Sequence, residues 1–96
     1  MAKTTAADLA ETQQQFNRTG TEFLKVDVAT ALTFSESALN THDPAKRRRN
    51  QRSARKAYDT ILHLAKKIAI SSGDVKELTD SLEQLKANLV RLGEVF

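Results

Sequence analysis

Two polar interruptions, at Asp43-Pro44 and at residues 71–74, divide this chain into stretches with helical periodicity. Asp43 suits the N-cap of a helix, and Pro44 suits the first helical position because its missing N–H has no partner there. In the sequence Ser-Ser-Gly-Asp of residues 71–74, Gly73 suits a left-handed C-cap position and Asp74 the start of the next helix. Since such short connections join antiparallel neighbours, they constrain the chain to helices packed side by side.

The predicted fold is all-α. The chain of 96 residues contains three Gly and one Pro and is 5% aromatic, a composition that favours helix over strand. Helices are predicted at about residues 21–40, 44–70 and 74–93, which gives an up-down-up antiparallel three-helix bundle. A chain of this length makes one domain with a modest core.

The first 20 residues are predicted to form an N-terminal arm outside the bundle of residues 21–96. Beyond Met1, the arm holds Leu9 and Phe16 as its only large apolar side chains, and two anchors bury little surface. We therefore expect either a loose arm or a short helix over residues 6–16, ended by the polar residues 17–20.

The first predicted helix carries a broad apolar face, which suits a helix that touches two neighbours. The face comprises Phe23, Leu24, Val28, Ala31, Leu32, Phe34, Ala38 and Leu39. Asp27 lies in the middle of this face and is therefore the candidate buried polar residue. Because a buried carboxylate needs a partner, we expect an ion pair or hydrogen bond with Arg47, Arg55 or Tyr58. A ligand-binding carboxylate would need a second converging polar group, which the sequence does not place.

Apolar residues recur every three or four positions along the third predicted helix and make a narrow seam. The members of the seam are Val75, Leu78, Leu82, Leu85, Leu89, Leu92 and Phe96. The positions beside the seam lack the paired charges of a parallel leucine zipper, which favours packing within one bundle. Packing against a second copy stays open, so a homodimer is the alternative.

The densest charge in the chain lies in the first half of the second predicted helix. Residues 46–56 hold seven Lys and Arg and no acid, although the net charge of the whole chain is only +3. The candidate partner-binding residues on the outer face of this helix are Arg48, Arg49, Arg52, Arg55 and Lys56. One interpretation is a solvated face that pairs with acids of neighbouring helices, or of an acidic or helical partner protein. One alternative is weak contact with nucleic-acid phosphates, which a ridge of cations attracts without reading sequence. A further alternative is contact with a membrane surface, or a localisation signal.

No pattern in the chain indicates an enzyme, a cofactor or a metal site. There is no Cys, and neither His42 nor His63 has a second ligand at metal-binding spacing. Phosphate-loop and metalloprotease motifs are absent from the sequence. No apolar run approaches the roughly 20 residues needed to span a bilayer, and the first residues lack the apolar segment of a secretion signal. We therefore expect a soluble, cytoplasmic, non-catalytic protein.

Residues 54–61, with the sequence Ala-Arg-Lys-Ala-Tyr-Asp-Thr-Ile, resemble the second helix of a tetratricopeptide hairpin. The three-helix plan with a terminal leucine stripe is similar to microtubule-interacting-and-transport domains. Both families are binding modules, so the resemblance implies a peptide ligand packed in a groove between helices. The chain departs from both patterns in residues 43–53, which are longer and more basic, and no second repeat follows.

These observations predict a helical protein-interaction module that uses the basic face of its second helix. A small, non-specific nucleic-acid-associated protein is the alternative.

Overall fold

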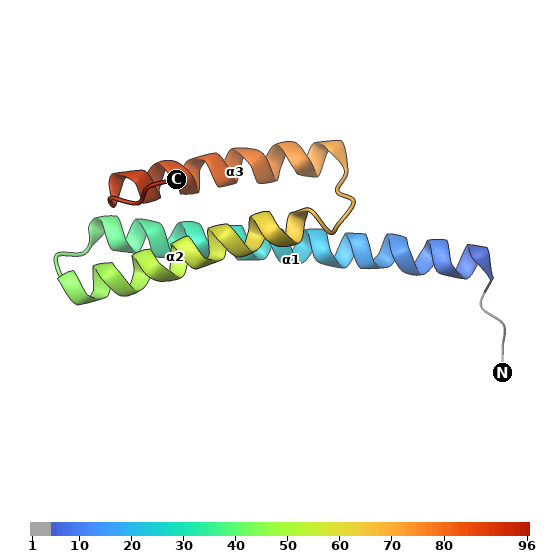
Figure 1. The fold of residues 1–96 in the computed structure, drawn as a ribbon, viewed down its shortest axis with the longest axis horizontal. Helices are drawn as coiled ribbons and strands as arrows, with labels where there is room; N and C mark the ends of the chain where they lie inside the picture. Colours follow the sequence, from blue (N-terminus) through green and yellow to red (C-terminus); the bar gives the residue numbers. More distant parts are fainter. Residues whose placement is uncertain (1–4) are drawn as a thin grey trace.

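The computed structural model describes residues 5–96 as three helices joined by short connections (Figure 1). The helices are α1 (Ala6–Asn40), α2 (Pro44–Ala65) and α3 (Ser72–Arg91). Successive helices run in opposite directions, and residues 5–96 contain no strand. The predicted all-α, up-down-up antiparallel three-helix bundle is therefore confirmed.

α1 is the central helix of the packing, because it contacts both α2 and α3, whereas α2 and α3 contact each other least. One apolar cluster joins the three helices. The buried members of this cluster are Leu24, Val28, Ala31, Ala54, Tyr58, Ile61, Leu78, Leu85 and Leu89. Ala31 and Ala54 are fully buried, and their small side chains allow the helices to approach closely. Three leucines of the α3 seam, Leu78, Leu85 and Leu89, thus pack inside their own chain, whereas Val75 is 45% exposed.

The buried face of α1 is narrower than the apolar face predicted from the sequence. Phe23 is 54% exposed and Phe34 is 37% exposed, although both were expected to touch a neighbouring helix. At about 100° per residue, both side chains lie to one side of the centre of the face at Leu24 and Val28. α2 and α3 cover the centre, so the aromatic residues beside it stay in contact with solvent.

The predicted end of a helix at residues 17–20 is wrong, since α1 continues through these residues without a break. Tertiary contacts hold this stretch in place. The Asn17 side-chain oxygen accepts a hydrogen bond from the backbone N–H of Ala69 at 3.3 Å. A Cβ added to Gly20 would lie 2.5 Å from Cδ1 of Ile68, so the absence of a side chain lets the α2–α3 connection approach α1.

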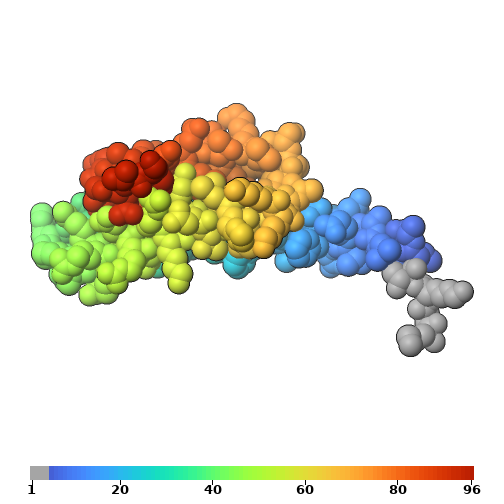
Figure 2. Space-filling view, viewed as in Figure 1, coloured from blue at the N-terminus to red at the C-terminus, as the bar shows by residue number. Residues whose placement is uncertain are grey.

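The expected N-terminal arm is helical over its described part, and residues 1–4 of the arm lie outside the described residues. Residues 6–16 form the first three turns of α1, are exposed throughout, and project past the end of the bundle (Figures 1 and 2). A capping box starts the helix: the Asp8 N–H donates to the Thr5 hydroxyl, and the Thr5 N–H donates to the Asp8 carboxylate, each at 3.1 Å. The hydrogen bonds from Thr5 lower the pKa of Asp8.

The first connection is formed as predicted. Asp43 caps α2 by accepting hydrogen bonds from the N–H groups of Ala45 and Lys46, and Pro44 occupies the first turn. Arg47 then closes the end of α1, because its guanidinium donates to the carbonyls of Ala38 at 3.2 Å and Thr41 at 3.1 Å. This arginine of the basic run is therefore a helix cap.

The second connection differs from the prediction. α2 ends at Ala65 rather than near residue 70, because the chain must turn there to bring Ile68 against Gly20. Gly73 lies inside α3, and Ser71, not Asp74, caps that helix by accepting a hydrogen bond from the Asp74 N–H.

The glycine that adopts a left-handed conformation is at the other end of α3. Gly93 has a φ of 101°, and the following residue, Glu94, donates its N–H to the carbonyl of Leu89 at 2.9 Å. This is the bonding expected when a helix ends at a glycine. It turns the last residues of the chain back toward α2.

Polar contacts between α1 and α3 add directional links to the apolar packing. The buried Asn88 amide donates to the buried Ser35 hydroxyl at 3.0 Å, so both polar groups are satisfied. At the other end of α3, the Lys25 ammonium lies 2.7 Å from the Asp74 carboxylate. The contact with Asp74 raises the pKa of Lys25, and the same contact lowers the pKa of Asp74.

We expect Leu85→Ala to lower the free energy of unfolding by about 2–5 kcal/mol, because Leu85 is fully buried at the α1–α3 contact and the substitution leaves a cavity. Leu82→Ala should lower it less, since Leu82 lies at the edge of the core. Urea unfolding followed by circular dichroism measures both. Equal losses below about 1 kcal/mol would show that the seam is not the core.

Candidate functional site

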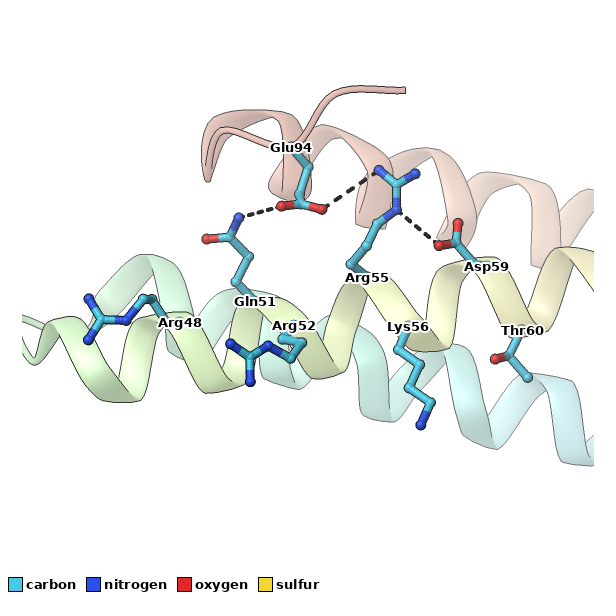
Figure 3. Close-up of a pocket in the computed structure, with 8 residues that line it drawn as sticks. All are labelled: Arg48, Gln51, Arg52, Arg55, Lys56, Asp59, Thr60 and Glu94. Carbon is cyan, nitrogen blue, oxygen red and sulfur yellow. Dashed lines mark hydrogen bonds and ion pairs between the residues drawn. The ribbon is translucent and has the colours of Figure 1, made fainter.

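The predicted partner-binding residues lie on α2, but they divide into two groups. Arg48, Arg49, Arg52 and Lys56 are exposed, whereas Arg55 is partly covered. We call the four exposed cations the basic face. At about 100° per residue they occupy a sector of roughly 100° of the helix circumference. Figure 3 shows Arg48, Arg52 and Lys56 projecting away from α3.

Arg55 points in the opposite sense, toward the end of the chain (Figure 3). Its guanidinium donates to the Val95 carbonyl at 2.9 Å and to the Asp59 carboxylate at 3.2 Å, and lies 3.8 Å from the Glu94 carboxylate. The same group lies 4.0 Å from the centroid of the Phe96 ring, a cation–π contact. These four contacts give Arg55 a structural role within the chain, so we leave it out of the basic face, and its assignment to the partner-binding set stays a prediction.

Further contacts hold the last residues of the chain against α2. We call these contacts, together with those of Arg55, the C-terminal clasp. The Gln51 amide donates to the Glu94 carboxylate at 2.6 Å. The Phe96 ring meets the Tyr58 ring edge-on, with centroids 5.1 Å apart. The sequence placed Phe96 in the apolar seam of the third helix, but it did not indicate Gln51 or Glu94, because neither lies on an apolar pattern.

An open groove of about 540 Å³ runs along α2 beside the clasp. It is lined by Arg48, Gln51, Arg52, Arg55, Lys56, Asp59, Thr60 and Glu94 (Figure 3). Both acids of the groove are engaged by Arg55. In residues 5–96 no carboxylate lies within 4.0 Å of the cationic atoms of Arg48, Arg52 or Lys56. One edge of the groove is therefore neutralised, and the other presents positive charge to solvent.

Asp27 is partly exposed rather than buried, and none of the expected hydrogen bonds or ion pairs with Arg47, Arg55 or Tyr58 forms. It lines a second groove, of about 320 Å³, between α1 and α2, together with Phe34 and Lys56. Its position at the edge of the covered surface leaves the carboxylate in contact with water, so no protein partner is required. The polar residues that are buried, Thr21, Ser35 and Asn88, were not indicated by the sequence.

The described part of the chain contains no cluster of three or more His, Asp or Glu side chains arranged to hold a metal ion. Within residues 5–96, no helix combines the length and apolar character needed to cross a membrane.

No family model, curated protein or solved structure matches this chain. The resemblance to tetratricopeptide and microtubule-interacting-and-transport domains therefore stays a prediction.

Arg55→Gln and Arg52→Gln remove the same charge from neighbouring turns of α2 and should differ in their effect on stability. Arg55→Gln should lower the free energy of unfolding by about 1–2 kcal/mol, because it removes a cation–π contact and charged hydrogen bonds to the clasp. Arg52→Gln should change it by less than about 0.5 kcal/mol. Urea unfolding measures both values, and equal effects would contradict the structural role of Arg55.

Proposed function

We propose that this protein is a non-catalytic helical interaction module whose basic face on α2 binds an acidic partner protein. The observation that supports the proposal is the exposure of Arg48, Arg49, Arg52 and Lys56 on one helix face, with no acid of residues 5–96 paired to them. The open groove beside them provides a concave surface against which a segment of the partner can pack.

The arrangement of the basic face is unfavourable for the isolated helix. Arg48, Arg52 and Lys56 follow one another at a spacing of four residues, and like charges at this spacing destabilise a helix by about 0.2–0.5 kcal/mol per pair. Arg48 and Arg49 also lie near the N-terminus of α2, where the helix dipole disfavours cations. A solvated surface with alternating charges would avoid both costs. An acidic partner offsets them, which is why we favour binding over a merely soluble surface.

The spacing of the basic face fits a helical partner. Four residues of α-helix rise by about 6 Å, so Arg48, Arg52 and Lys56 form a row of about 12 Å. Carboxylates at every fourth position of a partner helix repeat at the same interval. Arginine can bind each carboxylate through two parallel hydrogen bonds, which a point charge cannot do. An acidic helix is therefore the partner we propose, and the absence of Cys fits the expected location in the cytoplasm.

The test compares two variants with the same change in net charge. One carries Arg48→Gln, Arg49→Gln, Arg52→Gln and Lys56→Gln; the control carries Arg18→Gln, Lys67→Gln, Lys76→Gln and Arg91→Gln, all at exposed positions outside the face. The probe is a helical peptide with Glu at every fourth position. Its affinity should fall at least about tenfold in the first variant and less than about threefold in the control. Equal losses in the two variants would mean that only net charge matters, which contradicts the proposal.

Binding to a random-sequence DNA duplex, titrated with salt, tests the nucleic-acid alternative. No aromatic residue is among the described residues that line the groove beside the basic face, so that groove lacks a stacking platform for bases. We expect weak DNA binding that disappears as salt is raised. Tight binding to DNA that persists at high salt would overturn the choice of an acidic protein partner.

A further inference from the structure

A second surface, on α1, goes beyond the proposed function. Leu9, Phe16 and Phe23 are 61%, 57% and 54% exposed. They follow one another at intervals of seven residues and therefore lie on one face of the helix. We call these three side chains the aromatic stripe. Phe34, at 37% exposed, continues it toward the groove between α1 and α2.

The aromatic stripe does not face the hydrophobic core. The core face of α1 is centred on Leu24 and Val28, and the stripe lies roughly 100° away from it around the helix. Three of the four Phe residues of the chain lie on the stripe and its continuation, whereas the buried aromatic residue of the core is Tyr58. Large aromatic side chains gathered on one exposed face are typical of an interface rather than of a solvated surface.

The rest of the described chain does not reach the first part of the stripe. Residues 5–16 are exposed throughout, and the first contact with the α2–α3 connection is the hydrogen bond of Asn17 with Ala69 (Figure 1). The projecting turns over residues 6–16 have a length of about 16 Å. These turns extend α1 beyond the bundle and, among the described residues, have no packing of their own, so a partner that covers Leu9 and Phe16 would stabilise them.

We propose that a second copy of this chain covers the aromatic stripe, with the two α1 helices packed antiparallel about a two-fold axis at Phe16. In this register Phe16 packs against Phe16 of the second copy. Leu9 lies as far before Phe16 as Phe23 lies after it, so Leu9 of each copy packs against Phe23 of the other. The stripe is thus complementary to itself, as an interface with two-fold symmetry requires.

The charge around the stripe permits this pairing. The residues that flank it between its three members are Thr12, Gln13, Thr19 and Gly20. None of them is charged, so the centre of the contact carries no like charges; Asp27, one turn beyond Phe23, lies at its edge. Charge is also depleted at the centres of natural interfaces, where aromatic residues are enriched.

The area fits a dimer of moderate affinity. Leu9, Phe16 and Phe23 of each copy together offer on the order of 350 Å² of exposed side-chain surface. Two copies together with the flanking polar residues then bury about 900 Å², which lies in the range of weak, transient interfaces. We therefore expect dissociation in the micromolar range rather than an obligate dimer.

Sedimentation equilibrium tests the proposal with a matched pair of variants. The chain of 10.7 kDa should sediment as a dimer at high concentration. Phe16→Asp should weaken the dimer at least about thirtyfold, because it places a charge at the centre of the stripe. Gln14→Asp adds the same charge on the opposite side of the projecting turns and should change the affinity less than about threefold. A monomer at several hundred micromolar, or equal dimerisation by both variants, would overturn the proposal and leave the stripe to a different protein.

Disulfide cross-linking tests the direction of the two helices, and the absence of native Cys makes single-cysteine variants unambiguous. At concentrations where the dimer forms, oxidation should cross-link Phe16→Cys, since this residue meets itself at the axis. Leu9→Cys should not cross-link, because antiparallel packing separates the two copies of residue 9 by about 20 Å. Glu11→Cys, on the far side of the helix, is the control. Efficient cross-linking of Leu9→Cys would indicate parallel packing, and failure of Phe16→Cys in a dimer would exclude the register.

Discussion

The packing of α1 against both other helices is the contact on which the bundle depends. α2 and α3 contact each other least, so each is held mainly by the inner face of α1 around Leu24, Val28 and Ala31. The buried hydrogen bond between Ser35 and Asn88 adds direction to this packing, because an unpaired amide in the core would be costly. Where α2 and α3 do approach each other, the C-terminal clasp joins them.

The clasp also decides what the basic run of α2 can do. Arg47 caps α1 and Arg55 holds the end of the chain, so two of the cations act inside the molecule. The remaining exposed cations, among them Arg48 and Arg52, have no such partner in residues 5–96. A charge cluster that is uniform in sequence is therefore divided by the fold into a structural part and a surface part. The proposed interaction with an acidic helix concerns only the surface part.

α1 carries two apolar faces that serve different contacts. One face is buried by α2 and α3, while the aromatic stripe with Phe16 and Phe23 remains exposed. The helix extends past the bundle, so part of the stripe lies where no described element of the chain can cover it (Figure 1). The three residues of the stripe and the arginines of the basic face lie on different helices, but the two surfaces approach each other in the groove between α1 and α2, which Phe34 and Lys56 both line.

The amino-acid sequence by itself determined the helical class, the break at Pro44 and the leucine seam of α3, because these follow from local geometry and from the period of apolar residues. Tertiary structure decided the rest. Gly20 reads as the end of a helix, yet α1 continues because Ile68 packs where a side chain would be. Asp27 lies within an apolar pattern but is partly exposed, whereas Asn88 is buried. Helical periodicity specifies the direction of a side chain around its own axis, but burial and pairing depend on where neighbouring helices lie.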